Sequence, residues 1–570
     1  MAPGNRGHWS FDVRVFSIMK VGRKSFLGTD LVPVLGLGLS PIFITTSLNF
    51  DPINLPRLLL ISSLAGLAMF LLSMEFKNRP LASVSKEKVV FLALVATFVL
   101  TIFNSWFFSG ADIARQFYGK FGRNNGVLAY IGLSVILVSS SFARRANRGQ
   151  LLMMPVFIGG ILNLIYGYVQ LLGFDPINWQ NPYGPVVGTL GNPNFLSSFL
   201  AIFSLFIASR ILFATTLFSW GQVPLLLLFA ANQYLIWATG SIQGTVLVLM
   251  GIAILLALRF KLLLNTNLLL LIVSTAIFVL SFVLRGLLGE GPLGKYLYQS
   301  TLEVRTFFWS AAARMLLEKP IHGFGIDTFG DWYRRYRSEY ASQFSGDISG
   351  DSAHNLPLDF AAWGGVPLLF SWILLVCFVF WKTFRFVRRN IQVDSDLAFL
   401  IVAWMCYLLQ SLISINQLVL ALYGFTLTGL LCSRIMEDPI STFASRPRKI
   451  RQPIKALLAL LLGAFTAIPA VKLDIEFRQA LANQEGSRLI SVATSWPKNE
   501  SYMIFAAEIL VRSGYEKEAV DLSREALQIN PQSLGALKII YQSTITSADE
   551  KSFALKEIKF LDPWLWRNWT

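Results

Sequence analysis

Runs of about 20 apolar residues recur along this chain and restrict its fold more than any other feature, because that length crosses a bilayer. Of the 570 residues, 54% are hydrophobic and only 14% are charged. A soluble protein of this length carries more charge on its surface. We therefore expect an all-α, polytopic membrane protein. The runs predict about 13 transmembrane helices, at 31–48, 57–74, 88–108, 126–142, 151–173, 195–213, 222–238, 243–258, 266–284, 363–381, 396–414, 417–433 and 455–470.

Two of these runs leave alternatives open. No small-residue cleavage pattern follows the first run, which favours a retained helix over a signal peptide. Between 222–238 and 243–258, Gly240 and Gly244 mark either the turn of a hairpin or a break in one helix.

The net charge of +16 follows from basic residues that gather at alternate ends of the runs. The positive-inside rule then puts the N-terminus in the cytoplasm and leaves a nucleic-acid surface as the weaker alternative. The clusters predicted to be cytoplasmic are Lys77–Lys88, Arg144–Arg148, Arg259–Lys261, Lys382–Arg389 and Arg434–Lys455. The three cysteines lie within apolar runs and are too dispersed for a disulfide framework or a metal cluster.

This orientation divides the chain into a cytoplasmic N-terminal tail (1–30), a transmembrane domain (31–470) and an extracytoplasmic C-terminal domain (471–570). Within the transmembrane domain, the connections 109–125, 174–194 and 285–362 are predicted to lie outside the cytoplasm. The last is far longer than a connection between helices requires, which is typical of a functional loop. Its residues 307–317 predict an amphipathic helix at the membrane interface.

Residues 500–533 match a tetratricopeptide repeat, in which small residues let two helices pack closely. The matching residues are Ala507, Gly514, Ala519, Ala526 and Pro531. Prolines at a similar period on both sides suggest degenerate flanking repeats, since a lone repeat cannot bury its apolar face. The alternative is an arbitrary helical hairpin.

Histidine is scarce, and His354 stands in D-S-A-H-N directly before a predicted span. Its charge changes near neutral pH, so it is a candidate for proton transfer at the membrane surface, with Asp351 or Asp359 orienting it. The alternative is a hydrogen-bonded surface histidine. His322, in K-P-I-H-G-F-G, is expected to lie in a turn and is given no role.

Amides and guanidinium groups supply the other candidates on the same side. Asn192 and Asn194, in G-T-L-G-N-P-N, offer amide donors, although Asn194 could simply cap the following helix. Arg305, in R-T-F-F-W, and Arg123, in G-R-N-N-G, could each grip phosphate oxygens in pairs. The ordinary alternative for either arginine is an interfacial side chain that snorkels.

Taken together, these motifs resemble the O-antigen ligase family, which includes protein O-oligosaccharyltransferases and O-antigen polymerases. The resemblance covers about residues 90–430 and rests on the order and spacing of segments 122–126, 188–194, 305–325 and 351–358. It implies a GT-C-like fold in the cytoplasmic membrane of a bacterium. It also implies that a glycan passes from a polyprenyl-diphosphate carrier to a glycan, lipid or protein acceptor outside the cytoplasm, without cofactor, metal or nucleotide sugar.

The resemblance also assigns roles to residues. His354 matches the family's loop histidine, the candidate general base, and Arg305 matches its loop arginine, which would stabilise the leaving diphosphate. The family's S-R-G arginine is missing here, because T-G-S-I-Q-G places Ile242 or Gln243 there. Gln243, Arg123 or Arg314 is then expected to meet the remaining charge. Asn192, Asn194 and Asn355 are expected to position donor or loop, and Asp351 is a further candidate for substrate binding.

Two other functional classes compete with this one. A lipid-linked-glycan transporter would commonly place acidic residues within spans, and the predicted spans hold almost none. A scaffold that recruits a protein partner through its repeats would leave the long loop 285–362 unexplained.

Overall fold

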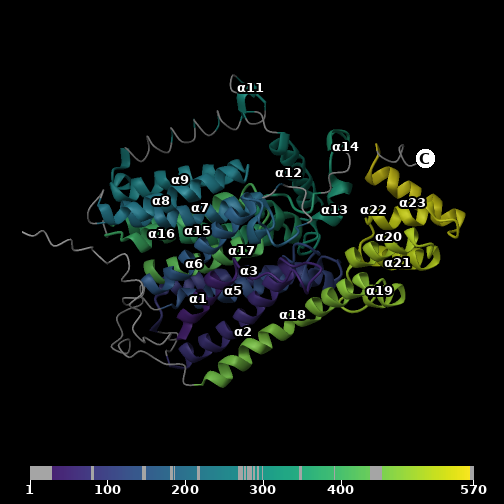
Figure 1. Cartoon of the computed structure of the whole chain (residues 1–570), viewed down its shortest axis with the longest axis horizontal. Helices are drawn as coiled ribbons and strands as arrows, with labels where there is room; N and C mark the ends of the chain where they lie inside the picture. Colours follow the sequence, from purple (N-terminus) through teal and green to yellow (C-terminus); the bar gives the residue numbers. More distant parts are fainter. Residues whose placement is uncertain are drawn as a thin grey trace, which may run out of the picture.

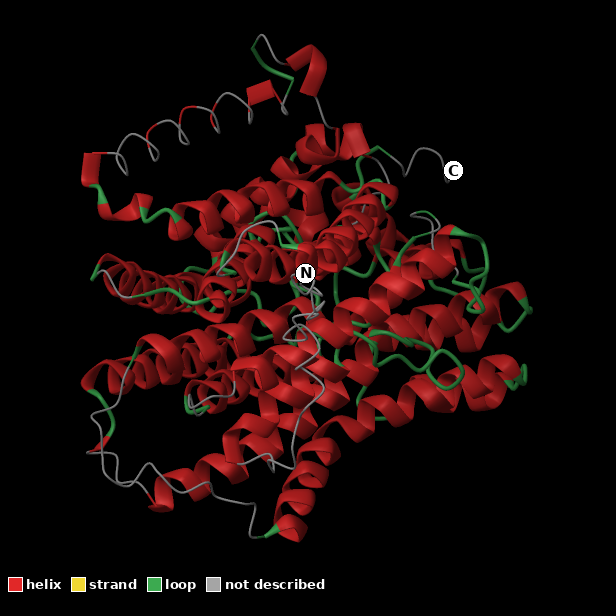
Figure 2. Cartoon of the chain, turned by 60° about the vertical axis from the view of Figure 1, so that its left-hand side comes forward, coloured by secondary structure: helices red, strands yellow, loops and turns green. Residues whose placement is uncertain are grey.

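The structure is a computed structural model that describes residues 28–78, 83–143, 149–179, 186–214, 219–267, 300–345, 350–389, 392–436 and 452–564, with scattered positions at 184 and in 268–299. The regular structure of this part of the chain is helical throughout (Figure 2). Eight of the described helices are long and apolar enough to cross a membrane, so the protein is a multi-pass membrane protein. They are Asn54–Lys77, Lys86–Phe108, Leu152–Leu171, Pro193–Leu212, Ile242–Arg259, Leu356–Arg388, Leu418–Ile435 and Pro453–Ala482.

A helix lies at every predicted span except 266–284, most of which falls outside the described residues. The N-terminal residues 1–27 and parts of the predicted cytoplasmic clusters also lie outside them. The helices at the predicted spans are α1 (Leu31–Leu39), α2 (Asn54–Asn78), α3 (Lys86–Phe108), α5 (Val127–Ser141), α6 (Gly149–Leu171), α7 (Pro193–Leu212), α8 (Val223–Ala238), α9 (Ile242–Arg259), α15 (Leu356–Arg388), α16 (Ser395–Ser411), α17 (Leu418–Ile435) and α18 (Pro453–Ala482).

Helix α1 is shorter than the run 31–48 that predicted it. It ends at Leu39, two residues before Pro41. A proline lacks the amide donor that continues a helix, and it disfavours helical backbone at the residue before it.

Helices α8 and α9 resolve the alternative at Gly240 in favour of a hairpin. Gln222, directly before α8, bonds to Ile211 of α7, and Asn232 within α8 bonds to Leu200, so α8 runs antiparallel to α7. Ser241 then meets Ser197, and Arg259 bonds to Leu212, so α9 runs back beside α7. Gly240 turns the chain with φ +71, a value that glycine adopts without strain.

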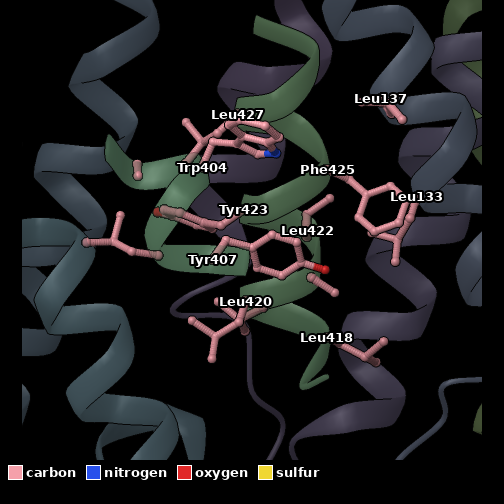
Figure 3. Packing of buried hydrophobic residues seen from close by; sticks show 14 of the residues in the cluster. Leu133, Leu137, Trp404, Tyr407, Leu418, Leu420, Leu422, Tyr423, Phe425 and Leu427 are labelled. Carbon is pink, nitrogen blue, oxygen red and sulfur yellow. The ribbon is translucent and has the colours of Figure 1, made fainter. Parts of the chain in front are cut away.

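The core of the helical bundle forms around α17, most of which is buried. Aromatic and leucine side chains of α16 and α17 pack there against leucines of α5 (Figure 3). The buried tyrosine hydroxyls keep polar partners: Tyr407 contacts Asn416, Asn416 contacts Tyr130, and Tyr423 donates to the Leu37 carbonyl. These bonds satisfy groups that neither lipid nor an apolar core could satisfy.

Helix α15 contains a break that positions the start of the helix. Gly365 has φ +67 and ψ −161, which interrupts the hydrogen bonds of the turn before it. The segment Pro320–Gly325 replaces them, since the Phe324 and Gly325 amides donate to the carbonyls of Ala362 and Trp363. The K-P-I-H-G-F-G motif is therefore more than a turn: it bonds to the backbone of a broken membrane helix, as apolar surroundings require.

The long loop also folds into helices. The predicted segment 307–317 lies within α12 (Ser300–Glu318), and shorter helices α13 (Phe329–Tyr336) and α14 (Glu339–Ser345) follow it. A short helix α4 (Ile113–Tyr118) lies in the connection between α3 and α5, and α11 (Gly294–Leu297) precedes α12.

The C-terminal helices are paired, as the repeat pattern predicted. Helices α19 (Gly486–Ala493), α20 (Glu500–Arg512), α21 (Glu516–Ile529), α22 (Leu534–Gln542) and α23 (Ala548–Leu561) pack in sequence order and form what we call the tail. Ala507, Ala519 and Ala526, expected between the two helices of the matched repeat, are fully buried. Helix α18 runs along α2 and continues without interruption into the tail (Figure 1).

Candidate functional site

The connections that the sequence singled out meet at one end of the bundle. Residues 119–126 bond to Asp327 and Asp351 of the long loop. Asn54, at the start of α2, bonds to the Gly122 carbonyl, and Arg57 on the next turn bonds to the Thr189 carbonyl. The G-T-L-G segment therefore reaches this end as well, and we call it the loop face.

The turn that carries His354 is shaped by Asp359, which is buried in the first turn of α15. Its carboxylate accepts hydrogen bonds from the Ser352 hydroxyl at 2.6 Å and the Ala353 amide at 2.7 Å. The Ser352 hydroxyl oxygen in turn accepts from the His354 amide at 3.0 Å. These bonds hold His354 at φ +52, a conformation that few residues other than glycine adopt.

The half-buried imidazole of His354 has two neighbours that fix its orientation. Its Nδ1 lies 3.1 Å from the Ser352 carbonyl oxygen, which can only accept, so Nδ1 carries the proton. Its ring stacks on Phe308 of α12, with centroids 5.0 Å apart and planes 18° apart. Nε2 is therefore the nitrogen that can accept a proton. Asp359 orients the imidazole only through the backbone of the turn, and the Nδ1 contact goes to neither Asp351 nor Asp359.

Arg305 lies one helical turn before Phe308, on the same face of α12. It is half-buried, and burial lowers the pKa of its guanidinium. It forms no ion pair with any carboxylate in the part of the chain that the structure describes. A half-buried guanidinium without a carboxylate partner has the character of an anion-binding group.

The surroundings of His354 favour the neutral imidazole. Burial lowers its pKa, and the charges of Arg305 and Arg123 lower it further, while the Ser352 hydrogen bond and Asp351 act in the opposite direction. The result is a pKa of about 4. His354, Arg305, Arg123 and Asp351 thus form one electrostatic cluster, although they come from three distant segments.

Asp351 is the acidic member of this cluster. Lys120 Nζ lies 2.7 Å from one carboxylate oxygen, and Arg123 lies 3.6 Å from the other. Burial raises the pKa of Asp351, but the charges of Lys120 and Arg123 outweigh burial and lower it to about 2. Lys120 was missed in the sequence, because nothing in a connection of 17 residues signals which basic side chain faces a distant aspartate.

A second acidic residue, Asp327, holds the backbone of the 119–126 segment. Its carboxylate accepts from the Lys120 amide at 2.7 Å and the Asn125 amide at 3.2 Å. Burial raises its pKa to about 6, although Arg115 opposes this effect. Arg115 itself pairs with Asp331 at 3.1 Å. These residues fix the geometry of the cluster and were not singled out in the sequence.

The amide candidates form a separate group on the loop face. Asn192, rather than Asn194, caps α7, since its side chain accepts from the Asn194 amide. The alternative in which Asn194 caps this helix is wrong, because Pro193 takes the first helical position. The Asn194 side chain accepts from Ser241 at 2.7 Å, and Gln243 donates to Ser198 at 2.9 Å. These hydrogen bonds join the start of α7 to the start of α9, and among the described residues none of them reaches His354.

Three further residues bond away from the cluster. Asn355 caps α15 and donates to the Leu412 carbonyl. The exposed Arg314 donates to the Tyr336 carbonyl, about 13 Å along α12 from Arg305. His322 contacts the Asn104 side chain and the Phe108 ring.

The cluster combines a neutral imidazole, two guanidinium groups and the Asp351 carboxylate, with Lys120 paired to that carboxylate, at one end of a membrane bundle. Such a set can accept a proton and bind a polyanion at neighbouring positions. No family model and no curated protein matches the chain.

Proposed function

We propose that the protein transfers a glycan from a polyprenyl-diphosphate carrier to a hydroxyl-bearing acceptor at the loop face. One observation carries the proposal: His354, with Nε2 free of its own proton, stacks on Phe308 one helical turn from Arg305. The sequence motifs that resemble the O-antigen ligase family support the same reaction class.

The chemistry follows from the charges. His354 Nε2 takes the proton of the acceptor hydroxyl while the hydroxyl oxygen attacks the anomeric carbon of the donor sugar. The bond from that carbon to the diphosphate breaks, and its electron pair stays on the diphosphate oxygen. Arg305 and Arg123 stabilise this developing charge. Attack opposite the leaving group inverts the anomeric configuration.

Donor binding also strengthens the base in this mechanism. Arg305 and Arg123 are two of the causes that lower the pKa of His354. A bound diphosphate neutralises their charges and raises the pKa toward its ordinary value. The imidazole is then basic when both substrates are present.

The remaining expectations belong to the same proposal. The bundle is GT-C-like with about 13 spans in a bacterial cytoplasmic membrane, with the N-terminus inside and the tail outside. The apolar helices hold the polyprenyl chain, and the Asn192, Asn194 and Gln243 group positions the donor. The tail presents or recruits the acceptor, which is another glycan chain, a lipid or a protein.

The test is transfer by the full chain in proteoliposomes that contain a polyprenyl-diphosphate-linked glycan and candidate acceptors. The informative variant is His354→Asn, because asparagine tolerates the positive φ of this position better than alanine and cannot act as a base. We expect the rate to fall by about 10²–10⁴-fold, with unchanged membrane insertion. Ordinary transfer by this variant would remove His354 from the reaction, and donor crossing the membrane without transfer would instead indicate a transporter.

A further inference from the structure

The segment 119–126 connects the tail to the candidate site. Its neighbouring side chains face in two directions: Lys120 and Arg123 contact Asp351, whereas Phe121 contacts the tail. The connection is short, since a single peptide bond separates the residue held by the tail from the residue held by the site.

On the tail side, Phe121 belongs to an aromatic cluster. Its ring stacks on Phe50 with centroids 5.4 Å apart, and lies 5.0 Å from Tyr502 and 6.1 Å from Phe505. Tyr502 and Phe505 belong to α20, the first helix of the matched repeat. Phe121 is therefore seated against the tail itself.

A buried carboxylate keeps this cluster in place. Asp474, near the end of α18, accepts from the Phe50 amide at 2.7 Å, the Asn49 side chain at 2.9 Å and the Tyr502 hydroxyl at 2.7 Å. One carboxylate thus joins the start of the tail to the segment before α2. The tail has a fixed position relative to Phe121.

On the site side, the segment has little freedom to adjust. Asp327 binds the Lys120 and Asn125 amides, and Gly119 and Gly126 pack so closely that a Cβ on either would meet backbone at 2.7 Å or less. A shift of Phe121 therefore moves Lys120. Lys120 is the ion-pair partner of Asp351, which lies three residues before His354.

We propose that the tail positions the candidate base, with Phe121 and Lys120 as the positioning residues that transmit its placement to the His354 turn. The kinetic part of this inference rests on the proposed transferase function. The mechanical part does not, because it concerns only the coupling of two segments.

The mechanical part is tested by amide hydrogen exchange on the full chain in lipid nanodiscs. We expect Phe121→Leu and Lys120→Met each to increase exchange in 350–356, although both substitutions lie more than 200 residues away in sequence. The matched control is Phe553→Leu, an exposed aromatic on α23 outside the cluster. Unchanged exchange at 350–356 in both variants would overturn the inference, whatever the protein catalyses.

The kinetic part is tested by a double-substitution cycle. If Phe121 acts through Lys120, the variant with both substitutions loses no more transfer rate than the worse single variant. Additive losses would mean that the two residues act separately and would overturn the pathway. If even the wild-type chain transfers no glycan, the proposed function fails while the exchange result still stands.

A third readout separates positioning from general loosening. The charged groups facing His354 are Arg305 from α12, Arg123 from 119–126 and Asp351 from its own turn. Lys120→Met leaves the Asp351 charge less neutralised, so the acid limb of kcat/KM shifts to higher pH. Asp351→Asn removes the charge that raises the His354 pKa, so the limb shifts to lower pH, whereas loosening alone would move both in the same direction. Lys120→Arg should restore the wild-type limb.

Discussion

Phe308 and His354 lie with their rings nearly parallel, 18° apart, although 46 residues separate them along the chain. Gly350 allows the contact, because a Cβ there would lie 2.6 Å from the Phe308 ring. The ring thereby fixes the imidazole on the face of α12 that also carries Arg305.

Replacing this ring tests whether the imidazole depends on it. We expect Phe308→Leu to lower the transfer rate by about two- to tenfold, because stacked aromatic pairs contribute about 0.5–1.5 kcal/mol beyond burial. The measurement is turnover in proteoliposomes. The control is Phe344→Leu on α14, whose ring contacts Phe307 instead. Equal losses in both variants would assign the effect to the loop's stability rather than to His354.

Arg305 distinguishes paired phosphate binding from simple charge. Its guanidinium can donate two parallel hydrogen bonds to a phosphate group, whereas an ammonium acts as a point charge. We expect Arg305→Ala to abolish measurable transfer and Arg305→Lys to restore only a small part of it. Full activity of the lysine variant, measured at saturating donor, would contradict bidentate binding. The controls are Arg314→Ala and Arg314→Lys at an exposed position of the same helix, and both should retain most of the wild-type transfer rate.

The long apolar runs predicted most of the bundle, because a bilayer requires long apolar helices whatever their neighbours are. The runs did not predict the break within α15, because that break is stabilised by a segment distant in sequence. The Gly365 break needs Pro320–Gly325 to satisfy its carbonyls, and those residues lie about 40 positions earlier in the chain. The early end of α1 has a local cause instead. Pro41 is visible in the sequence, but the span was predicted from the apolar run alone.

The sequence predicted the charged side chains of the candidate site but not the residues that hold them in place. His354, Arg305, Arg123 and Asp351 were singled out by residue type and shared membrane side, and the structure brings them together. Phe308, Lys120 and Asp327 were not, because an ordinary phenylalanine, lysine or aspartate acquires its role only from a partner far away in sequence. Asp359 was named as a residue that orients His354, but its hydrogen bonds hold Ser352 and Ala353 rather than the imidazole. Asn192 and Asn194 carried a turn signal, and their observed bonds are those of a helix start.

The raised pKa of Asp327 predicts that the stability of the fold depends on pH. Its folded-state pKa, about 6, is raised above the ordinary value near 3.8. The folded state therefore binds its proton more tightly than the unfolded state, so this residue's contribution is fully present below pH 3.8 and is lost as the pH rises through 6. Asp327→Asn keeps an acceptor for the two amides without the titration. We expect its thermal midpoint to change less than that of wild type between pH 4 and 6, and an unchanged pH slope would contradict the assignment.

The ion pairs of Asp562 predict that α13 stabilises the end of the tail. Its carboxylate is fully buried and lies 2.8 Å from Arg334 and 3.3 Å from Arg337. Asp562→Asn removes a counter-charge shared by the partly buried Arg334 and the buried Arg337, and breaking a buried pair of this kind costs about 3–5 kcal/mol. We expect a lower thermal midpoint and faster proteolysis of α22 and α23. Asp521→Asn, which removes an exposed partner of Arg524, should change little.

The close contact between α2 and α18 predicts that a large side chain there is damaging. Gly66 and Gly463 face each other so closely that a Cβ on Gly463 would lie 2.2 Å from the Ser62 carbonyl oxygen. Small residues let membrane helices pack backbone to backbone, and little of the apolar part of α18 is buried. Gly463→Leu should therefore separate α18 from α2, displace Asp474 from Asn49 and Phe50, and release the tail to limited proteolysis. Leu462→Ala, on the exposed face of α18, should leave the tail protected, and protection of both variants would mean that the tail is held without α18.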